Sequence, residues 1–165
     1  MQTNLRQAFT VVELIFVIVV IGILAAVALP RFGESADNAY LAKAQSEVAT
    51  IRAALATERQ KRVLRSDFTD ITDLALKDDG TASAGNAFDH FSADGDGNNA
   101  AVFQYPIPEC SSATARACWD RVNATHYEFR FLNASDGVDG KAKFILQNNR
   151  FDCDGDDADC QRITL

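Results

Sequence analysis

The sequence predicts an α+β fold in which one long, kinked amino-terminal helix packs on a small antiparallel β-sheet. Three observations support it: an uncharged apolar run from Leu14 to Leu29, apolar residues at helical spacing from Leu41 to Leu55, and strand patterns after Trp119. A helix followed by strands is typical of an α+β roll. We expect the first half of the helix to span a membrane and the second half to be amphipathic.

The first element is the apolar segment, which follows the polar stretch MQTNLRQA. From Phe9 to Leu29 a helix would rise about 30 Å, which matches the hydrocarbon thickness of a bilayer. The run is too long for the apolar region of an ordinary secretory signal. We therefore expect a membrane-spanning helix over residues 9–30, with a kink at Pro30, which lacks a backbone donor, and a weak point at Gly22.

The second element continues the helix over residues 31–65 as an amphipathic segment. Its apolar residues are three or four positions apart and form one stripe: Leu41, Ala44, Val48, Ile51 and Leu55. We expect this stripe to face a sheet; a coiled coil is the alternative, although about two and a half heptads are few for one. Lys43, Glu47, Arg52 and Glu58 lie off the stripe, and the basic run from Arg59 to Arg65 is interpreted as a solvated face.

The remaining residues, 66–165, are expected to form a globular head with a carboxy-terminal β-sheet. Residues 66–109 are rich in turn-forming residues and are interpreted as a connector with one short helix. Residues 127–131 and 142–146 show the period-two pattern of strands and predict an antiparallel hairpin. A further strand over residues 161–165 is expected to close the sheet.

The four cysteines all fall in the last third of the chain. Their even number and pairwise closeness favour two short-loop disulfides, Cys110 with Cys118 and Cys153 with Cys160, out of three connectivities that four cysteines allow. Structural zinc is disfavoured because the spacing is not that of a C-x-x-C site. Disulfides indicate an oxidising compartment for the head, so the amino terminus is expected to be cytoplasmic.

Two acidic stretches suggest calcium, although the sequence makes no cofactor certain. The loop DGDGNN offers oxygen ligands at alternate positions, as calcium loops do; the candidate ligands are Asp94, Asp96 and Asn98. It lacks the glycine and the glutamate of an EF-hand. In DCDGDDADC, crowded carboxylates repel one another and a cation would relieve the repulsion; the candidate ligands are Asp154, Asp156, Asp157 and Asp159. A solvated loop is the alternative at both places.

The composition bears on other function classes. The formal net charge is −7, which disfavours a nucleic-acid partner unless a local patch gathers Arg116, Arg121 and Arg130. The sequence has no G-x-S-x-G motif, glycine-rich phosphate cradle or metal-hydrolase motif. We therefore expect a protein that is not an enzyme.

A family resemblance rests on the residues from Arg6 to Phe32: a short polar leader, the motif Phe-Thr-x-x-Glu, an apolar helix and a proline. This segment resembles the amino-terminal segment of type IV pilins and of the pseudopilins of type II secretion systems. The resemblance implies a pilin-like roll, a leader over residues 1–8, cleavage between Ala8 and Phe9 by a prepilin peptidase, and methylation of the new amino terminus. Ala8 departs from the glycine that the family usually has before the cleavage point.

The same motif contains a carboxylate, Glu13, at the edge of the apolar segment. A charge in that position is costly unless it lies near an interface or is paired. In the family this glutamate is thought to pair with the amino terminus of a neighbouring subunit, which would join Glu13 to the amino group of Phe9 in the next copy. The alternative is a capping box, in which Thr10 caps the helix and Glu13 returns to the backbone of Thr10.

The resemblance implies a structural subunit of a type IV pilus-like filament. Such a subunit is inserted in the bacterial inner membrane with its head in the periplasm, and is then assembled through its apolar helix into a periplasmic or cell-surface filament. The partners implied are the lipid bilayer, the prepilin peptidase, an inner-membrane assembly platform, and copies of itself with related pilins or pseudopilins. Two alternatives are a type II secretion pseudopilin that drives protein export, and a membrane-tethered periplasmic module that binds calcium or a partner without polymerising.

Overall fold

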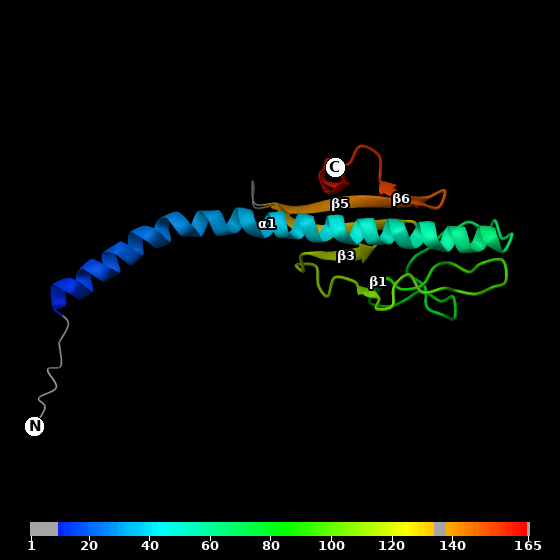
Figure 1. The fold of residues 1–165 in the computed structure, drawn as a ribbon, viewed down its shortest axis with the longest axis horizontal. Coiled ribbons are helices and arrows are strands. Elements are labelled where there is room, and N and C mark those ends of the chain that lie inside the picture. Colours follow the sequence, from blue (N-terminus) through cyan, green and yellow to red (C-terminus); the bar gives the residue numbers. More distant parts are fainter. Residues whose placement is uncertain (1–9, 134–137, 165) are drawn as a thin grey trace, which may run out of the picture. The chain divides into compact units, whose positions relative to one another are not determined.

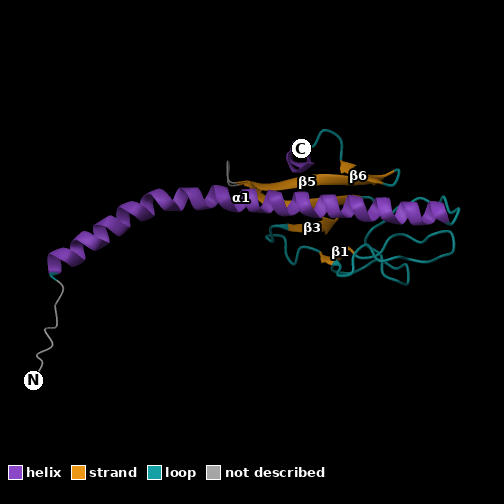
Figure 2. Ribbon diagram, in the orientation of Figure 1, coloured by secondary structure: helices purple, strands orange, loops and turns teal. Residues whose placement is uncertain are grey.

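The computed structural model describes residues 10–133 and 138–164, without the side chains of residues 28–37, 132, 133 and 138. The chain divides into two compact units, Met1–Ala36 and Asp37–Leu165. Figures 1 and 2 show the elements. In chain order they are α1 (Val11–Leu64), β1 (Asn86–Phe88), β2 (Ile107–Pro108), β3 (Cys118–Arg121), β4 (His126–Asn133), β5 (Val138–Gln147), β6 (Arg150–Cys153) and α2 (Ala158–Thr164).

The first unit contains the amino-terminal part of α1. Every described side chain from residue 11 to residue 27 is exposed, and the exposed fraction of the large apolar ones runs from 37% at Val20 to 76% at Val12. Over the residues that the structure describes, no helix combines the length and the apolar character needed to cross a bilayer. The long amino-terminal helix is therefore observed, while its membrane-spanning half is not confirmed.

The second unit contains the rest of α1, which lies over a four-stranded sheet (Figure 2). The stripe predicted from helical spacing is confirmed, because Ala44, Val48, Ile51 and Leu55 are buried in the core and Leu41 packs against it. Burial of such side chains removes about 25 cal/mol of unfavourable hydration per Å² of apolar surface. This stripe attaches the helix to the sheet.

The sheet has the order β3-β4-β5-β6, and all its neighbours are antiparallel. The predicted hairpin is confirmed as β4 and β5, in which Tyr127 faces Phe144 and Phe129 faces Ala142. The two outer strands, β3 and β6, were not predicted. Their short length explains this, because four residues give too few alternations to show a period of two.

The strand predicted over residues 161–165 is wrong as far as residue 164, and Leu165 lies outside the described residues. Residues 158–164 instead form the helix α2, which packs on β5. The Asp157 carboxylate accepts a hydrogen bond from the backbone N–H of Cys160 at 2.7 Å, and its carbonyl accepts one from Gln161 at 3.0 Å. An aspartate in the cap position starts a helix where a closing strand was expected.

The connector is also different from its prediction, because none of residues 66–109 is helical. It forms turns, isolated bridges and the two-stranded sheet of β1 and β2. Side chains take the backbone donors that a helix would use: Asp73 accepts from the N–H of Ala75 at 2.9 Å, and the Tyr127 hydroxyl accepts from the N–H of Leu74 at 2.9 Å. Local hydrogen bonding to side chains competes with helix formation.

An aromatic cluster fills the space between α1, the connector and the sheet. Phe88 stacks on Tyr127 with ring centroids 5.0 Å apart, and Phe144 stacks on Phe151 at 5.1 Å. Trp119 meets Phe88 edge-on at 5.2 Å, and its indole N–H donates to a Glu47 carboxylate oxygen of α1 at 2.9 Å. The polar end of the buried tryptophan therefore has a partner, as burial requires.

Two disulfides confirm the predicted pairing. Cys110 is bonded to Cys118, with Cα atoms 5.2 Å apart, and Cys153 to Cys160, with Cα atoms 5.6 Å apart. The first closes a short loop that leads into β3, and the second ties α2 to the end of β6. Short covalent loops restrict the unfolded chain and fix the ends of the sheet.

Candidate functional site

The candidate site begins where α1 starts. The Thr10 hydroxyl accepts a hydrogen bond from the backbone N–H of Glu13 at 3.3 Å, and the Thr10 carbonyl accepts one from Leu14 at 3.2 Å. Thr10 is thus the helix cap. Its hydroxyl makes one of the two hydrogen bonds of the capping box considered for this motif. Glu13 lies in the first turn and is exposed. A carboxylate in the first turn is favoured by the helix dipole.

Glu13 is the single charged residue in the stretch from 11 to 27. No ion pair joins its carboxylate to another residue of the part that the structure describes. Ala8 and Phe9, the residues of the predicted cleavage, lie outside the described residues. The cleavage, the methylation of Phe9 and the pairing of Phe9 with Glu13 therefore stay predictions.

The apolar helix surface around Glu13 is uninterrupted. A Cβ atom added at Gly22 would meet no atom within 4 Å, so nothing in the described chain packs against this glycine. The backbone is helical at Gly22 and at Pro30. The Pro30 side chain lies outside the described ones, and the kinks predicted at these two positions stay predictions. Chemically, this surface can bury itself among apolar groups and hold one ion pair.

In the first acidic loop, the Asp94 carboxylate is already bonded within the protein. One oxygen of the buried Asp94 carboxylate accepts hydrogen bonds from the backbone N–H of Asn98 at 2.8 Å and of Asp96 at 3.1 Å. The other oxygen is 2.8 Å from a guanidinium nitrogen of Arg65. Hydrogen bonds from the Asn98 backbone, with those from Asp96 and Arg65, lower the pKa of Asp94. Its charge is already balanced by protein donors.

The second acidic stretch is similar, because several of its carboxylates already have partners in the protein. Asp157 caps α2, Asp159 lies 3.5 Å from Arg162, and Asp154 lies 4.0 Å from His126. Asp156 is exposed. Among the described residues, no three His, Cys, Asp or Glu side chains are grouped to hold a metal. Calcium stays a prediction that this arrangement does not favour.

The three arginines considered for a basic patch each meet an aspartate. Arg116 pairs with Asp139, Arg121 with Asp73 at 2.5 Å, and Arg130 with Asp120. An aspartate beside each guanidinium offsets its charge. A phosphate backbone would therefore meet little net positive charge from these three groups.

The interpretation of the basic run as a solvated face is wrong at Arg62, whereas Lys61 and Arg65 are exposed. Arg62 is fully buried, and its guanidinium lies 3.1 Å from the Glu58 carboxylate, which is also buried. The same guanidinium donates to the carbonyl oxygens of Ser92 at 2.6 Å and Ala93 at 3.3 Å. The connector covers this face of the helix, which the helical period alone could not show. The spacing of four between Glu58 and Arg62 was the available signal.

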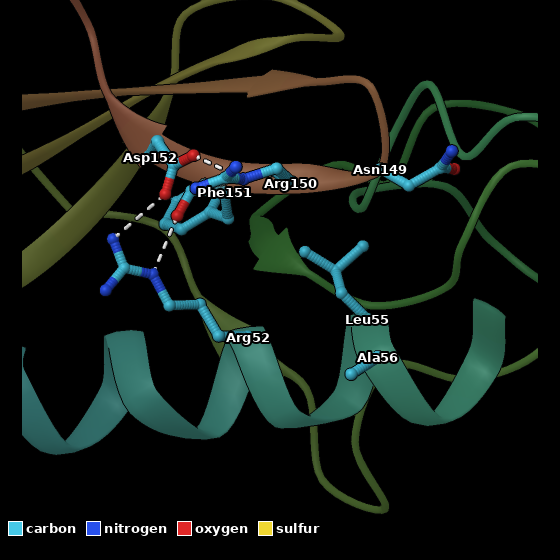
Figure 3. A pocket seen from close by; sticks show the side chains of 7 residues that line it. All are labelled: Arg52, Leu55, Ala56, Asn149, Arg150, Phe151 and Asp152. Atoms are coloured by element: carbon cyan, nitrogen blue, oxygen red, sulfur yellow. Dashed lines mark hydrogen bonds and ion pairs between the residues drawn. The ribbon is translucent and has the colours of Figure 1, made fainter. Parts of the chain in front are cut away.

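A shallow cavity of about 330 Å³ lies between α1 and the turn that joins β5 to β6 (Figure 3). Two arginines share one carboxylate there: Arg52 lies 3.3 Å and Arg150 2.9 Å from different oxygens of Asp152. Arg52 also donates to the carbonyl of Phe151 at 2.8 Å. These contacts fasten α1 to β6, so we assign the cavity a structural role.

Comparison with known proteins adds one relative. No protein-family model and no solved structure matches the chain significantly. The type IV narrow pilus major component PilA5 of Thermus thermophilus is 46% identical over 50 residues. The aligned stretch is 30% of this chain and 43% of that relative, so it spans less than half of either protein. Through this stretch the chain is related to the type IV pilin family.

Proposed function

We propose that this protein is a structural subunit of a type IV pilus-like filament and is assembled through the amino-terminal half of α1. The observation that carries the proposal is the exposed apolar surface of residues 11–27. Apolar surface of this size is unfavourable in water and is removed when copies pack together. A head-to-tail contact that does not close into a ring generates a helical filament. The relationship to a pilus component supports the same function.

The proposed path to the filament passes through a membrane. Residues 9–30 would lie in the bacterial inner membrane, with the second unit in the periplasm, until an assembly platform adds the subunit to the filament. A prepilin peptidase would remove residues 1–8 and leave a methylated amino group on Phe9. The Phe-Thr-x-x-Glu motif and the uncharged run from Leu14 to Leu29 support this path. The two disulfides agree with an oxidising compartment for the second unit.

Glu13 is proposed to set the register between copies. Its carboxylate is exposed in the first turn of α1, where an amino group of a neighbouring Phe9 could reach it. Transfer of an unpaired carboxylate into an apolar filament core is unfavourable, and an ion pair reduces that penalty. The cap by Thr10 uses the backbone N–H of Glu13, so capping and pairing are compatible.

The test compares the full chain with Glu13→Ala in its native host. We expect mass spectrometry to find methylated Phe9 as the amino terminus, and the variant to stay in the membrane while its amount in a sheared filament fraction falls. Gln45→Ala, a change at an exposed position of the same helix, is the control and should assemble normally. A chain that still begins at Met1 and never pellets as filaments would contradict the proposal. Filaments confined to the periplasm would assign a pseudopilus.

A further inference from the structure

The two disulfides of the second unit lie in different surroundings. Cys160 is fully buried in the core, and Cys153 packs against the core. Cys110 and Cys118 are partly exposed and belong to neither group. A thiol that reduces a disulfide must contact one of its sulfur atoms, so the rate of reduction depends on access to that atom. The Cys110–Cys118 bond is therefore the more accessible of the two.

The charge around the two bonds favours the same order of reduction. The stretch between Cys153 and Cys160 contains four aspartates and no basic residue. Two of these, Asp156 and Asp157, form no ion pair in the part of the chain that the structure describes. The stretch between Cys110 and Cys118 contains one arginine and no acidic residue. Because the attacking group is an anionic thiolate, the aspartates repel it and add to the protection of Cys153–Cys160.

The Cys110–Cys118 bond closes a loop that contacts α1. Ala117 in this loop has a φ of 56°, in the left-handed region that is unfavourable for alanine. Its carbonyl accepts a hydrogen bond from the Lys43 ammonium of α1 at 2.5 Å, and the same ammonium lies 3.6 Å from the Glu47 carboxylate. Opening the disulfide would let Ala117 leave this conformation, and the contact of the loop with α1 would then loosen.

The strand next to the loop does not depend on the disulfide. Cys118 pairs with Arg130 through the backbone of β3 and β4, and the Cys110 N–H donates to the Trp119 carbonyl at 2.9 Å. These backbone hydrogen bonds remain possible when the two sulfur atoms are thiols. The change on reduction is therefore expected to be local, with the sheet in place and the loop of residues 111–117 released.

We propose that the Cys110–Cys118 disulfide is a redox-sensitive latch on the loop of residues 111–117, whereas Cys153–Cys160 is a structural bond that stays closed under the same conditions. The reductant is a dithiol. One of its thiolates attacks a sulfur atom of the Cys110–Cys118 bond, which breaks, and a mixed disulfide forms. The second thiol of the reductant displaces the remaining cysteine, so the reductant leaves as a disulfide and two electrons and two protons pass to the cysteines. This inference concerns the second unit alone and does not depend on filament assembly.

The order of reduction is tested on the full-length protein in detergent. The protein is treated with dithiothreitol for increasing times, blocked with N-ethylmaleimide and analysed by peptide mass spectrometry. We expect Cys110 and Cys118 to be labelled about tenfold faster than Cys153 and Cys160, and oxidised glutathione to restore the bond. The preference should be larger with anionic mercaptopropionate than with cationic cysteamine. Equal rates with dithiothreitol, or earlier opening of Cys153–Cys160, would overturn the proposal.

The control for the folded surroundings is the same experiment in guanidinium chloride. Unfolding exposes all four cysteines, and the high salt concentration screens the aspartates. The two bonds should then open at similar rates. A preference that persists in the unfolded chain would mean that the structure does not set the order, and would also overturn the proposal.

Release of the loop is tested by hydrogen exchange of the partly reduced protein. We expect exchange in residues 111–117 to rise about tenfold while exchange in residues 158–164 stays unchanged. Ala117→Gly should make the bond roughly fivefold harder to reduce at equilibrium with glutathione, because glycine tolerates the left-handed conformation. Ala113→Gly, a change at an exposed position of the same loop, is the control and should leave this equilibrium nearly unchanged. Unchanged exchange in residues 111–117 after reduction would show that the bond is not a latch.

Discussion

Glu58 and Arg62 lie one helical turn apart on α1 and form an ion pair of 3.1 Å with only 4% and 0% of their side chains exposed. Arg62 also donates to the carbonyl of Ser92 at 2.6 Å, so one guanidinium joins the helix end to the connector. A buried ion pair of this kind adds little net stability, but removing one partner leaves an uncompensated buried charge, which is strongly destabilising. The connector that carries the Asp94 loop is positioned by this contact.

Arg62→Met is therefore expected to lower the free energy of unfolding by about 3–5 kcal/mol, because the Glu58 carboxylate stays buried without its partner. Urea unfolding followed by fluorescence of Trp119, the one tryptophan of the chain, measures it. Arg59→Met is the control, since Arg59 makes one exposed hydrogen bond, to the Thr69 carbonyl at 3.2 Å. Equal losses in the two variants would show that the buried pair has no special role.

Gly140 faces Phe131 across the β4–β5 hairpin, and an added Cβ would lie 2.5 Å from the phenyl ring. Gly140→Ala should therefore lower the free energy of unfolding by about 1–3 kcal/mol through overpacking. Gln147→Ala, an exposed change in the same strand, is the control. Phe131→Leu combined with Gly140→Ala should recover part of the loss, and no recovery would argue against the ring as its cause.

Removal of the Cys153–Cys160 disulfide by paired serine substitutions is expected to cost about 2–4 kcal/mol of stability. The bond holds α2 on the end of β6, so hydrogen exchange should rise first in residues 158–164. The Cys110–Cys118 pair has a sequence separation of 8, close to the 7 of the other pair, and is the matched comparison. If both double variants leave exchange in α2 unchanged, its attachment depends on packing alone.

The pH dependence of stability should show the contribution of Asp67. A hydrogen bond from the Gly95 backbone, with others from Thr69, lowers the pKa of Asp67 to about 2. A folded-state pKa below the ordinary value of about 3.9 means that the unfolded chain binds the proton more tightly. The stabilisation is present above about pH 4 and is lost as the pH falls toward 2. Asp67→Asn should make the free energy of unfolding depend less on pH over that range. An unchanged slope of the unfolding free energy against pH would contradict this assignment.

The parts of the fold that the sequence predicted are those with long regular patterns. The stripe from Leu41 to Leu55 repeats over four turns, and the hairpin pattern repeats over both β4 and β5. Both predictions depend on which face of an element is apolar, and that face can be identified from residues close together in the sequence. The disulfide pairing followed in the same way from cysteines close together in the sequence.

The missed features depend on contacts between distant residues. The Tyr127 hydroxyl replaces a helical hydrogen bond at Leu74, 53 positions away in the sequence. Arg62 is buried because Ser92 and Ala93 come to lie over it. Neither of these contacts could be predicted from the sequence alone. At the candidate site the motif around Glu13 was recognisable from the sequence. The exposure of Val63 and Leu64 was not, because an apolar residue late in a helix normally indicates core.

The packing of the second half of α1 on the sheet has a mechanical consequence. Within the second unit, tension along the helix axis would reach the sheet through the side chains of this half. The load would then act in shear on the interlocked side chains from Ala44 to Leu55 and on the Arg52 contact with β6. Shearing requires many contacts to yield together, so a subunit built in this way would hold under a pull that would peel a hairpin open strand by strand.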